Sequence, residues 1–481
     1  MIRRRIIEFF VFGCAVVLLE TLLFAPSTWR DSTPFNTPIF AETTFVLRDA
    51  GTQWLVFVCL GGYFAGLVWV RTRHRDPFLE AHNPALWLAC VLLTSAGVYA
   101  FQNSSNIDAL MLSGGAVIGQ AAGWAVWEDG TRRERGTGEG VPGKGGNLRG
   151  LIVAAMIVLL SLASLRKDGA PRSFEYHGDL RWTGPWDNPN NFGLLMGTGV
   201  TLAIGTILTR FRSVVQGAFQ RRCFEPGKWL LAILFIAAAA IMARGLLHSY
   251  SRGAWLATAC GMGYLALLAS RLLRIAFAEN SASKATVKRR FCHNAASAGL
   301  IVASIAVITF WQFRHTEWTP ARRAVSATSA RDFSWRNRVS AWEGAWQTTV
   351  EHSLLGAGWG QPERLYEHFY LRPALTDGAA IEMNDHLMLG ATLGMPALFC
   401  FGMYVWLSLR RKSEIGDWRL EIPEVNWLQT TCRAGAIVLL VGFWFDGGLF
   451  KLPTAATFWI LLESGSVNNH ESHEPAKHLN R

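Results

Sequence analysis

The sequence predicts an all-α polytopic membrane protein with about 12 transmembrane helices and one long, largely helical loop on its outer side. Three observations lead to this class. Of the 481 residues, 51% are hydrophobic and only 17% are charged, whereas about 25% of a typical soluble domain is charged. The apolar residues come in runs of roughly 15 to 22, long enough to cross a bilayer. Basic or Gly/Pro-rich stretches separate these runs, which disfavours a cytosolic enzyme, a disordered chain and a small disulfide-rich domain.

Apolar segments mark the expected spans and divide the chain. They cover 6–24, 54–70, 84–101, 107–127, 151–165, 192–208, 229–243, 254–270, 295–313, 387–409, 434–445 and 454–463. The last two are short, so they form either tilted spans or a re-entrant hairpin around residues 446–448. The expected units are a bundle of nine spans (1–313), an outer loop that carries part of the site (314–386), three further spans (387–463) and a disordered cytoplasmic tail (464–481).

Basic residues orient the spans. If the N-terminus is inside, the inside segments hold 29 Lys and Arg and the outside segments hold 9, once the loop 314–385 is set aside. Long loops escape the positive-inside rule, so both termini are predicted to be cytoplasmic. The formal net charge of +11 then belongs to the inside loops, and no nucleic-acid partner is expected. All eight cysteines fall in spans or inside loops, so the outer face needs no disulfide.

Two polar motifs stand at the outer starts of spans. In the first, Asn188 and Asn190 flank a proline; they either cap the helix that follows or line a polar mouth with their amides. In the second, Arg252 follows Ser251 at the start of a span. A cation there does not complement the helix dipole, but it suits an anion such as a diphosphate. The alternative is an arginine that reaches lipid headgroups.

A third motif is an expected outside helix over roughly 333–351. An apolar stripe runs along one face of this helix, and it contains Trp335, Val339, Trp342, Trp346 and Val350. The stripe packs either in a core or on the membrane surface, with Arg336 and Arg338 on its two flanks.

A fourth polar motif, just before the tenth span, contains Glu382, Asp385 and His386. It places two carboxylates and one imidazole at the membrane edge. The imidazole is either a general base or an interface residue held by hydrogen bonds.

Taken together, these motifs resemble the O-antigen ligase and polymerase superfamily of membrane glycosyltransferases. The matching elements, in chain order, are Gly184 with Asn188-Pro189-Asn190, Ser251-Arg252-Gly253-Ala254-Trp255, Arg338 with Trp342, Leu355-Gly356-Ala357-Gly358, Asn384 with Leu387, and Leu393-Gly394-Met395-Pro396. The resemblance covers about 180–410. One departure stands out: when the chain is registered on Gly394, the family's usual histidine falls at Met383, and His386 follows three residues later on the same helix face.

The resemblance implies a transferase in the bacterial inner membrane that uses no cofactor. It would move a glycan from a polyprenyl (undecaprenyl) diphosphate to a lipid A-core or glycan hydroxyl at the periplasmic face. Arg252 and Arg338 would hold the diphosphate, Arg336 would assist, and His386 would take the acceptor proton. Asn188, Asn190, Trp342, Asp385 and Glu382 would bind substrate, and membrane lipids would surround the bundle. No Asp-x-Asp motif and no metal-spaced His/carboxylate cluster is present in the sequence, so metal-independent catalysis is expected.

Other functions remain open at the level of sequence. A repeat-unit polymerase and a protein O-oligosaccharyltransferase share the superfamily and its motifs. A polysaccharide or lipid transporter or flippase belongs to another class, for which broken spans and mid-membrane charges are typical. Apart from Asp446, the expected spans carry almost no charge near their middle, and this disfavours a transporter.

The topology is tested with reporter fusions after residues 140, 285 and 350. A reporter that is active only in the periplasm should work at 350 and stay silent at 140 and 285, because the basic asymmetry places only residue 350 outside. Activity at 285 would contradict the orientation.

Overall fold

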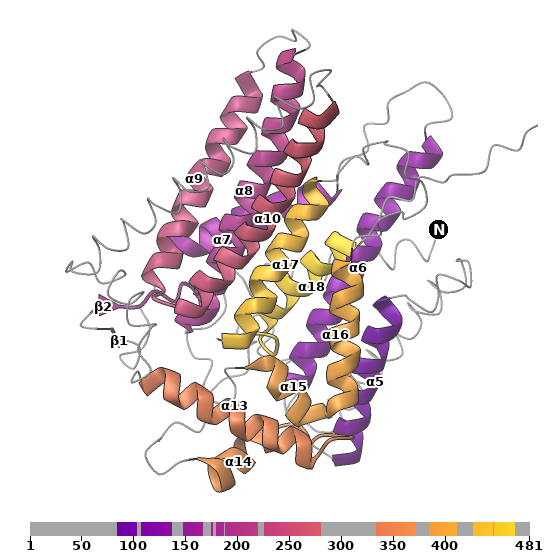
Figure 1. The fold of residues 1–481 in the computed structure, drawn as a ribbon, viewed down its shortest axis with the longest axis vertical. Helices are drawn as coiled ribbons and strands as arrows, with labels where there is room; N and C mark the ends of the chain where they lie inside the picture. Colours follow the sequence, from indigo (N-terminus) through magenta and orange to yellow (C-terminus); the bar gives the residue numbers. More distant parts are fainter. Residues whose placement is uncertain are drawn as a thin grey trace, which may run out of the picture.

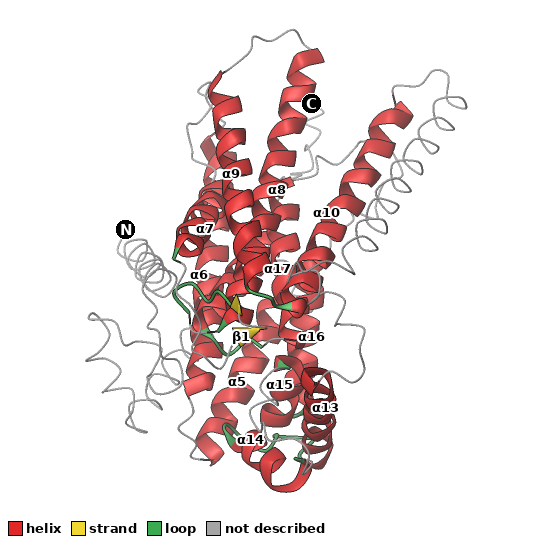
Figure 2. Cartoon of the chain, turned by 90° about the vertical axis from the view of Figure 1, so that its left-hand side faces the viewer, coloured by secondary structure: helices red, strands yellow, loops and turns green. Residues whose placement is uncertain are grey.

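The structure is a computed structural model, and it describes residues 84–102, 107–136, 148–166, 175–176, 179–186, 188–219, 226–279, 333–371, 384–410, 427–445 and 447–466. Within these residues the fold is almost entirely helical (Figures 1 and 2). A two-residue antiparallel pair, β1 (Glu175–Tyr176) with β2 (Asp179–Leu180), is the exception. The expected spans 6–24, 54–70 and 295–313 lie outside the described residues, so the number of spans stays a prediction.

Five helical segments are long and apolar enough to cross a membrane: Leu148–Leu165, Pro189–Thr209, Leu230–His248, Arg252–Ser270 and Trp427–Phe445. They belong to α7 (Leu148–Leu165), α8 (Pro189–Phe219), α9 (Pro226–His248), α10 (Arg252–Glu279) and α17 (Trp427–Phe445). Shorter or more polar helices pack beside them: α5 (Pro84–Gln102), α6 (Ile107–Gly136), α16 (Met395–Leu409) and α18 (Leu452–Ser466). The membrane-protein character predicted from the sequence is therefore present in the fold.

Burial separates the centre of the bundle from its periphery. The span in α8 is largely buried and packs against α9, α10 and α17. The span in α9 is mostly exposed, and its Leu230, Ile233, Leu234 and Ile236 side chains are 55% to 61% exposed. Exposed leucine and isoleucine on a long apolar helix are what a lipid-facing surface requires. α8 is thus a central helix, and α9 presents one side to lipid.

A row of glycines on α6 forms the groove in which α18 lies. Gly115, Gly119 and Gly123 are spaced four residues apart and face Trp459 and Glu463 of α18. A Cβ atom on Gly119 would lie 2.4 Å from the Cβ of Trp459 and 2.8 Å from its carbonyl oxygen. Small residues at this spacing let two membrane helices approach closely, because van der Waals contact drives their association in lipid.

Two expected spans differ from the sequence prediction. The tenth, 387–409, is broken at Gly394 into α15 (Asp385–Leu393) and α16. The fifteen residues of α16 extend about 22 Å, which is shorter than the hydrocarbon core of roughly 30 Å. The eleventh, expected at 434–445, is a 19-residue helix that begins at Trp427 and includes Arg433.

The buried charges of α17 and α18, Arg433 and Glu463, both lie near the C-terminal end of α18. Arg433 Nε donates to the carbonyl of Gly465 at 2.8 Å, so a cation satisfies the C-terminal end of α18. The carboxylate of Glu463, one turn from that end, accepts from Gln120 Nε2 at 2.5 Å and from the hydroxyl of Tyr404. These groups hold α6, α16, α17 and α18 together at the end of the bundle remote from α15.

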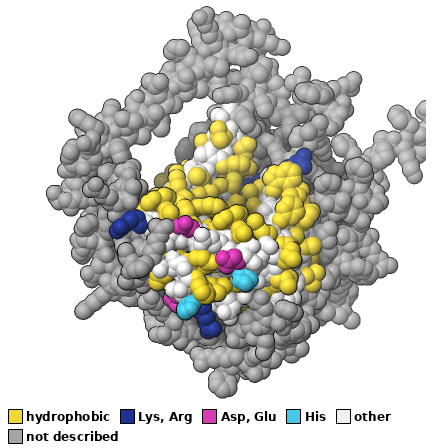
Figure 3. Space-filling view, turned by 60° about the horizontal axis from the view of Figure 1, so that its bottom comes forward, with side chains coloured by type: hydrophobic (Ala, Val, Ile, Leu, Met, Phe, Trp, Pro, Cys, Tyr) yellow, Lys and Arg dark blue, Asp and Glu magenta, His cyan; other side chains and the backbone are white. Residues whose placement is uncertain are grey.

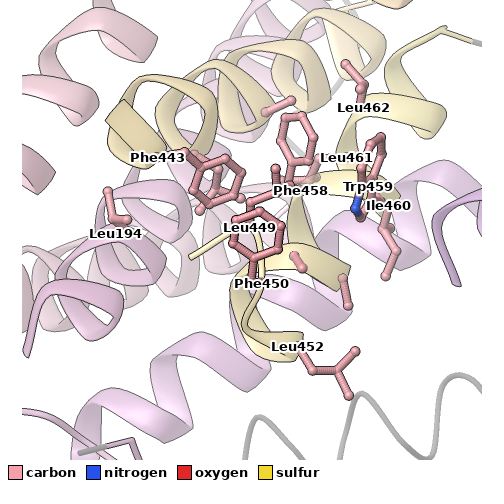
Figure 4. Packing of buried hydrophobic residues seen from close by; sticks show 14 of the residues in the cluster. Leu194, Phe443, Leu449, Phe450, Leu452, Phe458, Trp459, Ile460, Leu461 and Leu462 are labelled. Atoms are coloured by element: carbon pink, nitrogen blue, oxygen red, sulfur yellow. The ribbon is translucent and has the colours of Figure 1, made fainter. Parts of the chain in front are cut away.

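Across the opposite end lies α13 (Phe333–Glu351), which packs against α15, with the short α14 (Gln361–Leu365) and the π-helical turn η2 (Tyr366–Tyr370) beside it (Figure 1). α8, α10 and α15 all begin at this end. Buried aromatic rings pack inside the bundle: Phe458 contacts Phe443 and Trp459, with centroid separations of 5.3 and 5.0 Å (Figure 4).

The glycine groove generates a stability prediction. Gly119→Ala should lower the stability of the folded bundle by about 1–3 kcal/mol, because the added methyl overpacks the contact with Trp459. Thermal unfolding of the detergent-solubilised protein measures the effect. Gly114→Ala in the same helix is the matched control, because its Cβ would meet nothing within 4 Å. Equal midpoints for the two variants would contradict the close approach of α6 and α18.

Candidate functional site

The Asn-Pro-Asn motif starts α8, and its two asparagines have different roles. Asn188 is the N-cap: its Oδ1 accepts the Asn190 N–H at 2.8 Å, and its carbonyl accepts from Phe192 N at 3.1 Å. Pro189 occupies the first helical position, where a missing N–H costs nothing. The Oδ1 of Asn190 instead accepts from Arg181 Nη2 at 2.6 Å. The capping interpretation is therefore correct for Asn188, and Asn190 is held by a different residue.

A tight turn between α9 and α10 places Arg252. Tyr250 is buried and adopts a left-handed backbone with φ of 50°, which is strained for a residue with a side chain. The Ser251 hydroxyl accepts the Ala254 N–H at 3.2 Å and caps α10. Arg252 is the first residue of that helix, so its Cα position is set by a turn with little freedom.

Arg181 and Trp182 bind this turn from the segment before α8. Arg181 Nε donates to the carbonyl of Ser249 at 2.8 Å. Trp182 N donates to the carbonyl of His248 at 3.0 Å, and the Trp182 and His248 rings stack at 4.3 Å. Gly193 of α8 faces Ser249 closely: a Cβ there would lie 2.6 Å from its Oγ. The starts of α8 and α10 are thus joined through one cluster.

The orientation of α13 decides between the two interpretations of its aromatic stripe. Trp335, Val339, Trp346 and Val350 are 41% to 52% exposed, so the stripe is not core. The buried face is instead small and polar, and it contains Asn337, Ser340, Ala341, Gly344, Ala345, Thr348 and Thr349. The flanking arginines are not equivalent, because Arg336 is exposed and Arg338 is half-buried. Trp342 turns inward and contacts Trp444 at 6.1 Å and Phe445 at 6.2 Å.

Two glycine motifs bind each other through their backbones, in what we name the glycine clasp (residues 353–358 and 391–395). The N–H groups of Ala357 and Gly358 donate to the carbonyls of Ala391 and Thr392 at 2.7 and 3.1 Å, and Met395 N donates to Ser353 O at 2.8 Å. Gly356 and Gly394 have φ of 70° and 86°. A Cβ on Gly356 would lie 2.1 Å from the Thr392 oxygen, so only glycine fits. The clasp fixes the end of α13 to the break between α15 and α16.

At the start of α15, Asn384 and Asp385 set the position of His386. Asn384 caps the helix, since its Oδ1 accepts the Leu387 N–H at 3.1 Å. The buried carboxylate of Asp385 accepts the Leu449 N–H at 2.6 Å and so ties α15 to the loop between α17 and α18. Burial raises the pKa of Asp385 to about 7, although the N–H groups of Leu449 and Gly448 and the charge of Lys451 oppose the shift.

The imidazole of His386 lies against α17. Its Nε2 is 3.1 Å from the carbonyl oxygen of Leu440; a carbonyl can only accept, so Nε2 carries the proton and Nδ1 is the nitrogen able to take one. The ring lies 5.6 Å from Trp444 and 5.9 Å from Phe401. Burial lowers the pKa of His386, and the bond to Leu440 opposes this shift. A neutral imidazole with one accepting nitrogen results.

The two halves of the site meet where α8 packs against α17. A Cβ on Gly442 would lie 2.1 Å from Leu194 Cδ2, so the two helices touch one turn from Asn190 and two residues from Trp444. Trp444 in turn contacts both Trp342 and His386. Figure 3 shows this end of the molecule, where acidic, basic and imidazole side chains stand among apolar ones.

The sequence-predicted residues thus form two groups at one end of the bundle. Asn188, Asn190 and Arg252 belong to the starts of α8 and α10, while Trp342, Asp385 and His386 contact the end of α17 or the loop after it, and Arg338 lies one turn before Trp342 on α13. Arg336 belongs to neither group, and Glu382 lies outside the described residues. Sequence analysis missed several residues that the fold adds here: Arg181, Trp444, and Lys451 and Asp108, whose charges act on Asp385. An arginine three residues before Gly184 was the available signal for the first of them.

The long apolar helices define a membrane protein, and arginines lie at the start of α10 and on the surface helix α13. The family model described as Wzy_C, O-antigen ligase, matches residues 237–402. This segment is therefore similar to that family, in agreement with the resemblance drawn from the motifs. The match contains Arg252, Arg338 and His386, and it starts after the Asn-Pro-Asn motif. No curated protein matches the chain.

Asp385 generates a prediction about pH. A carboxyl whose folded pKa is about 7, against about 3.9 in an unfolded chain, keeps its proton more tightly when folded. Its contribution to stability is complete at pH values below the pKa of the unfolded chain, and it is lost as the pH rises through about 7. Asp385→Asn, which keeps an oxygen for Leu449, should remove this part of the pH dependence.

Thermal unfolding of wild type and variant at several pH values between 5 and 8 checks this expectation. Glu367→Gln in η2 is the control, since that side chain is exposed and should leave the wild-type pH dependence intact. An identical slope in Asp385→Asn and wild type would contradict the assignment.

Proposed function

We propose that the chain is an O-antigen ligase-like glycosyltransferase. It would move a glycan from a polyprenyl (undecaprenyl) diphosphate carrier to an acceptor hydroxyl, on lipid A-core or another glycan, at the periplasmic face of a bacterial inner membrane. The observation that carries the proposal is the family match over 237–402, which contains both proposed diphosphate-binding arginines and the proposed base. An activity of the ligase or polymerase type is supported by that match directly.

The chemistry of the leaving group explains the arginines. The acceptor oxygen forms a bond to the anomeric carbon, the bond from that carbon to the diphosphate breaks, and the electron pair leaves with the diphosphate. The catalyst must stabilise this growing charge. Arg338 on α13 and Arg252 at the start of α10 would supply cations. The N-terminal turns of α8, α10 and α15 would add partial positive charge.

His386 would take the acceptor proton. Its Nδ1 is the nitrogen that can accept a proton, because Nε2 is committed to Leu440. A lowered pKa keeps the ring neutral before the reaction, as a general base requires. Trp342 and Trp444 would offer aromatic surface to a sugar, and the exposed stripe of α13 would lie against membrane lipid.

Metal-independent catalysis is part of the proposal. Among the described residues, no three His, Cys, Asp or Glu side chains lie close enough to hold a metal ion. Arginines would therefore perform the charge neutralisation that a cation performs in other transferases. Purified protein in excess chelator should keep its transfer activity; loss of activity that Mg²⁺ or Mn²⁺ restores would overturn this part.

Polymerisation of repeat units and protein O-glycosylation are the alternatives within the superfamily, and the match does not distinguish them. A transporter or flippase is the alternative from another class. The buried charges Arg433 and Glu463 do not favour it, because both are bound within the bundle, Arg433 to Gly465 and Glu463 to Gln120 and Tyr404.

The gel pattern of surface glycans in a deletion strain tests the proposed function. A ligase predicts that long glycans disappear from the lipid core while carrier-linked chains accumulate. A single repeat unit retained on the core would indicate a polymerase instead. Loss of surface glycan with the carrier-linked glycan held on the inner leaflet would overturn the enzyme proposal in favour of a flippase.

Arg338→Lys tests the diphosphate contact. Lysine keeps the charge but loses the planar two-pronged geometry of a guanidinium, so transfer should fall about 10²- to 10³-fold while the protein still inserts. Transfer by purified protein, normalised to folded protein, is the measurement. Arg364→Lys on exposed α14 is the matched control and should stay near wild type. Wild-type transfer by Arg338→Lys would remove the mechanistic support for the proposed site.

His386→Gln tests the base. Glutamine can still donate to Leu440 but cannot take a proton at neutral pH, so kcat should fall more than binding of the carrier-linked donor. Steady-state kinetics and donor binding to the same preparation separate the two quantities. If kcat stays near wild type, the base lies elsewhere, with Glu382 and Asp385 next in line.

A further inference from the structure

One side chain connects two of the motifs proposed to bind the donor. Arg181 Nη2 donates to Asn190 Oδ1 at 2.6 Å, and its Nε donates to the carbonyl of Ser249 at 2.8 Å. We propose that Arg181 is a positioning residue for glycan transfer. It orients the Asn190 amide toward the diphosphate and fixes the turn that precedes Arg252. This inference rests on the proposed function and deepens it.

The bond from Arg181 determines which end of the Asn190 amide is available. A guanidinium has only donors, so the amide oxygen must face it and Nδ2 must face away. The backbone N–H of Asn190 is already bound to Asn188 Oδ1. What Asn190 presents to a ligand is therefore the two N–H groups of Nδ2, in the first turn of α8. Donors at the positive end of a helix dipole suit a diphosphate oxygen.

The second bond acts on Arg252. Ser249 opens the turn in which Tyr250 has φ of 50° and Ser251 caps α10, so a shift at Ser249 carries directly to Arg252, three residues later. Trp182 strengthens the same attachment through its bond to His248 O at 3.0 Å. Nε and Nη2 of Arg181 both donate to protein oxygens, so we expect its effect on the donor to pass through Asn190 and the α9–α10 turn.

Kinetics of transfer from a carrier-linked glycan test this role with Arg181→Gln, Asn190→Ala and the double variant. Each single variant should lose roughly 10- to 100-fold in kcat/KM, the range for a hydrogen bond to a charged group. If Arg181 acts through Asn190, adding Asn190→Ala to Arg181→Gln costs less than about 2-fold more. Arg364→Gln on exposed α14 controls for the loss of one positive charge at this end.

Asn190→Asp separates positioning from simple bracing. The carboxylate keeps the tie to Arg181 as an ion pair, so the melting temperature should equal or exceed that of wild type. It also replaces the N–H donors with a negative charge, so transfer should fall at least as far as in Asn190→Ala. If Arg181 only stabilises the fold, Asn190→Asp should be both stable and fully active.

The outcomes distinguish the two levels of the proposal. Wild-type protein that transfers no glycan removes the proposed function. If wild-type protein is active, three results leave the function standing and overturn the positioning role. They are a kcat/KM of Arg181→Gln near that of wild type, additive losses in the double variant, and an active Asn190→Asp. If Arg181→Gln does not fold, Asn190→Asp still decides, since it retains the Arg181 bond.

Discussion

The arrangement of the site depends on the glycine clasp between residues 353–358 and 391–395. A helix end leaves carbonyls without partners, and in α15 two of these, Ala391 and Thr392, receive the N–H groups of Ala357 and Gly358. Both chains must approach to backbone contact, which the positive φ and missing side chains of Gly356 and Gly394 allow. These hydrogen bonds thereby satisfy the carbonyls at the end of α15 and attach α13 to the bundle. Trp342 of α13 and His386 of α15 both contact Trp444 in this arrangement.

Residues of α13 and α15, which the clasp joins, contact the end of α17 and the loop that follows it. Leu440 binds His386, Trp444 contacts both His386 and Trp342, and the loop that follows donates Leu449 N–H to Asp385. Trp359, within the glycine-rich break, contacts Phe450 of the same loop at 5.9 Å. Buried Phe443 and Phe458 pack near this loop (Figure 4). Close packing of this kind favours the fixed geometry that preorganised charge stabilisation requires.

Small residues decide how closely the helices approach. Gly193 lets α8 meet the α9–α10 turn, Gly442 lets α17 meet Leu194 of α8, and the α6 glycines accept Trp459. Between helices in lipid, close van der Waals contact takes the role that the hydrophobic effect has in the core of a soluble protein. The same logic explains the surface of α13. Its small polar face packs on α15 and η2, so its tryptophan stripe stays outside, where an amphipathic helix can meet the membrane interface.

Amino-acid order alone was sufficient for the membrane class, the starts of α8 and α10, the helix at 333–351 and the family resemblance, because apolar run length, capping residues and short motifs act locally. It also located Arg338 and His386 as residues of interest. Tertiary structure decided the rest. The broken tenth span depends on Gly394 meeting residues some forty positions earlier, and the partner of Asn190 is known only once α8 folds beside Arg181. The inward turn of Trp342 and the commitment of His386 Nε2 to Leu440 follow from packing against α17. Contacts between distant segments carry no local pattern, so periodicity and spacing had no means of revealing them.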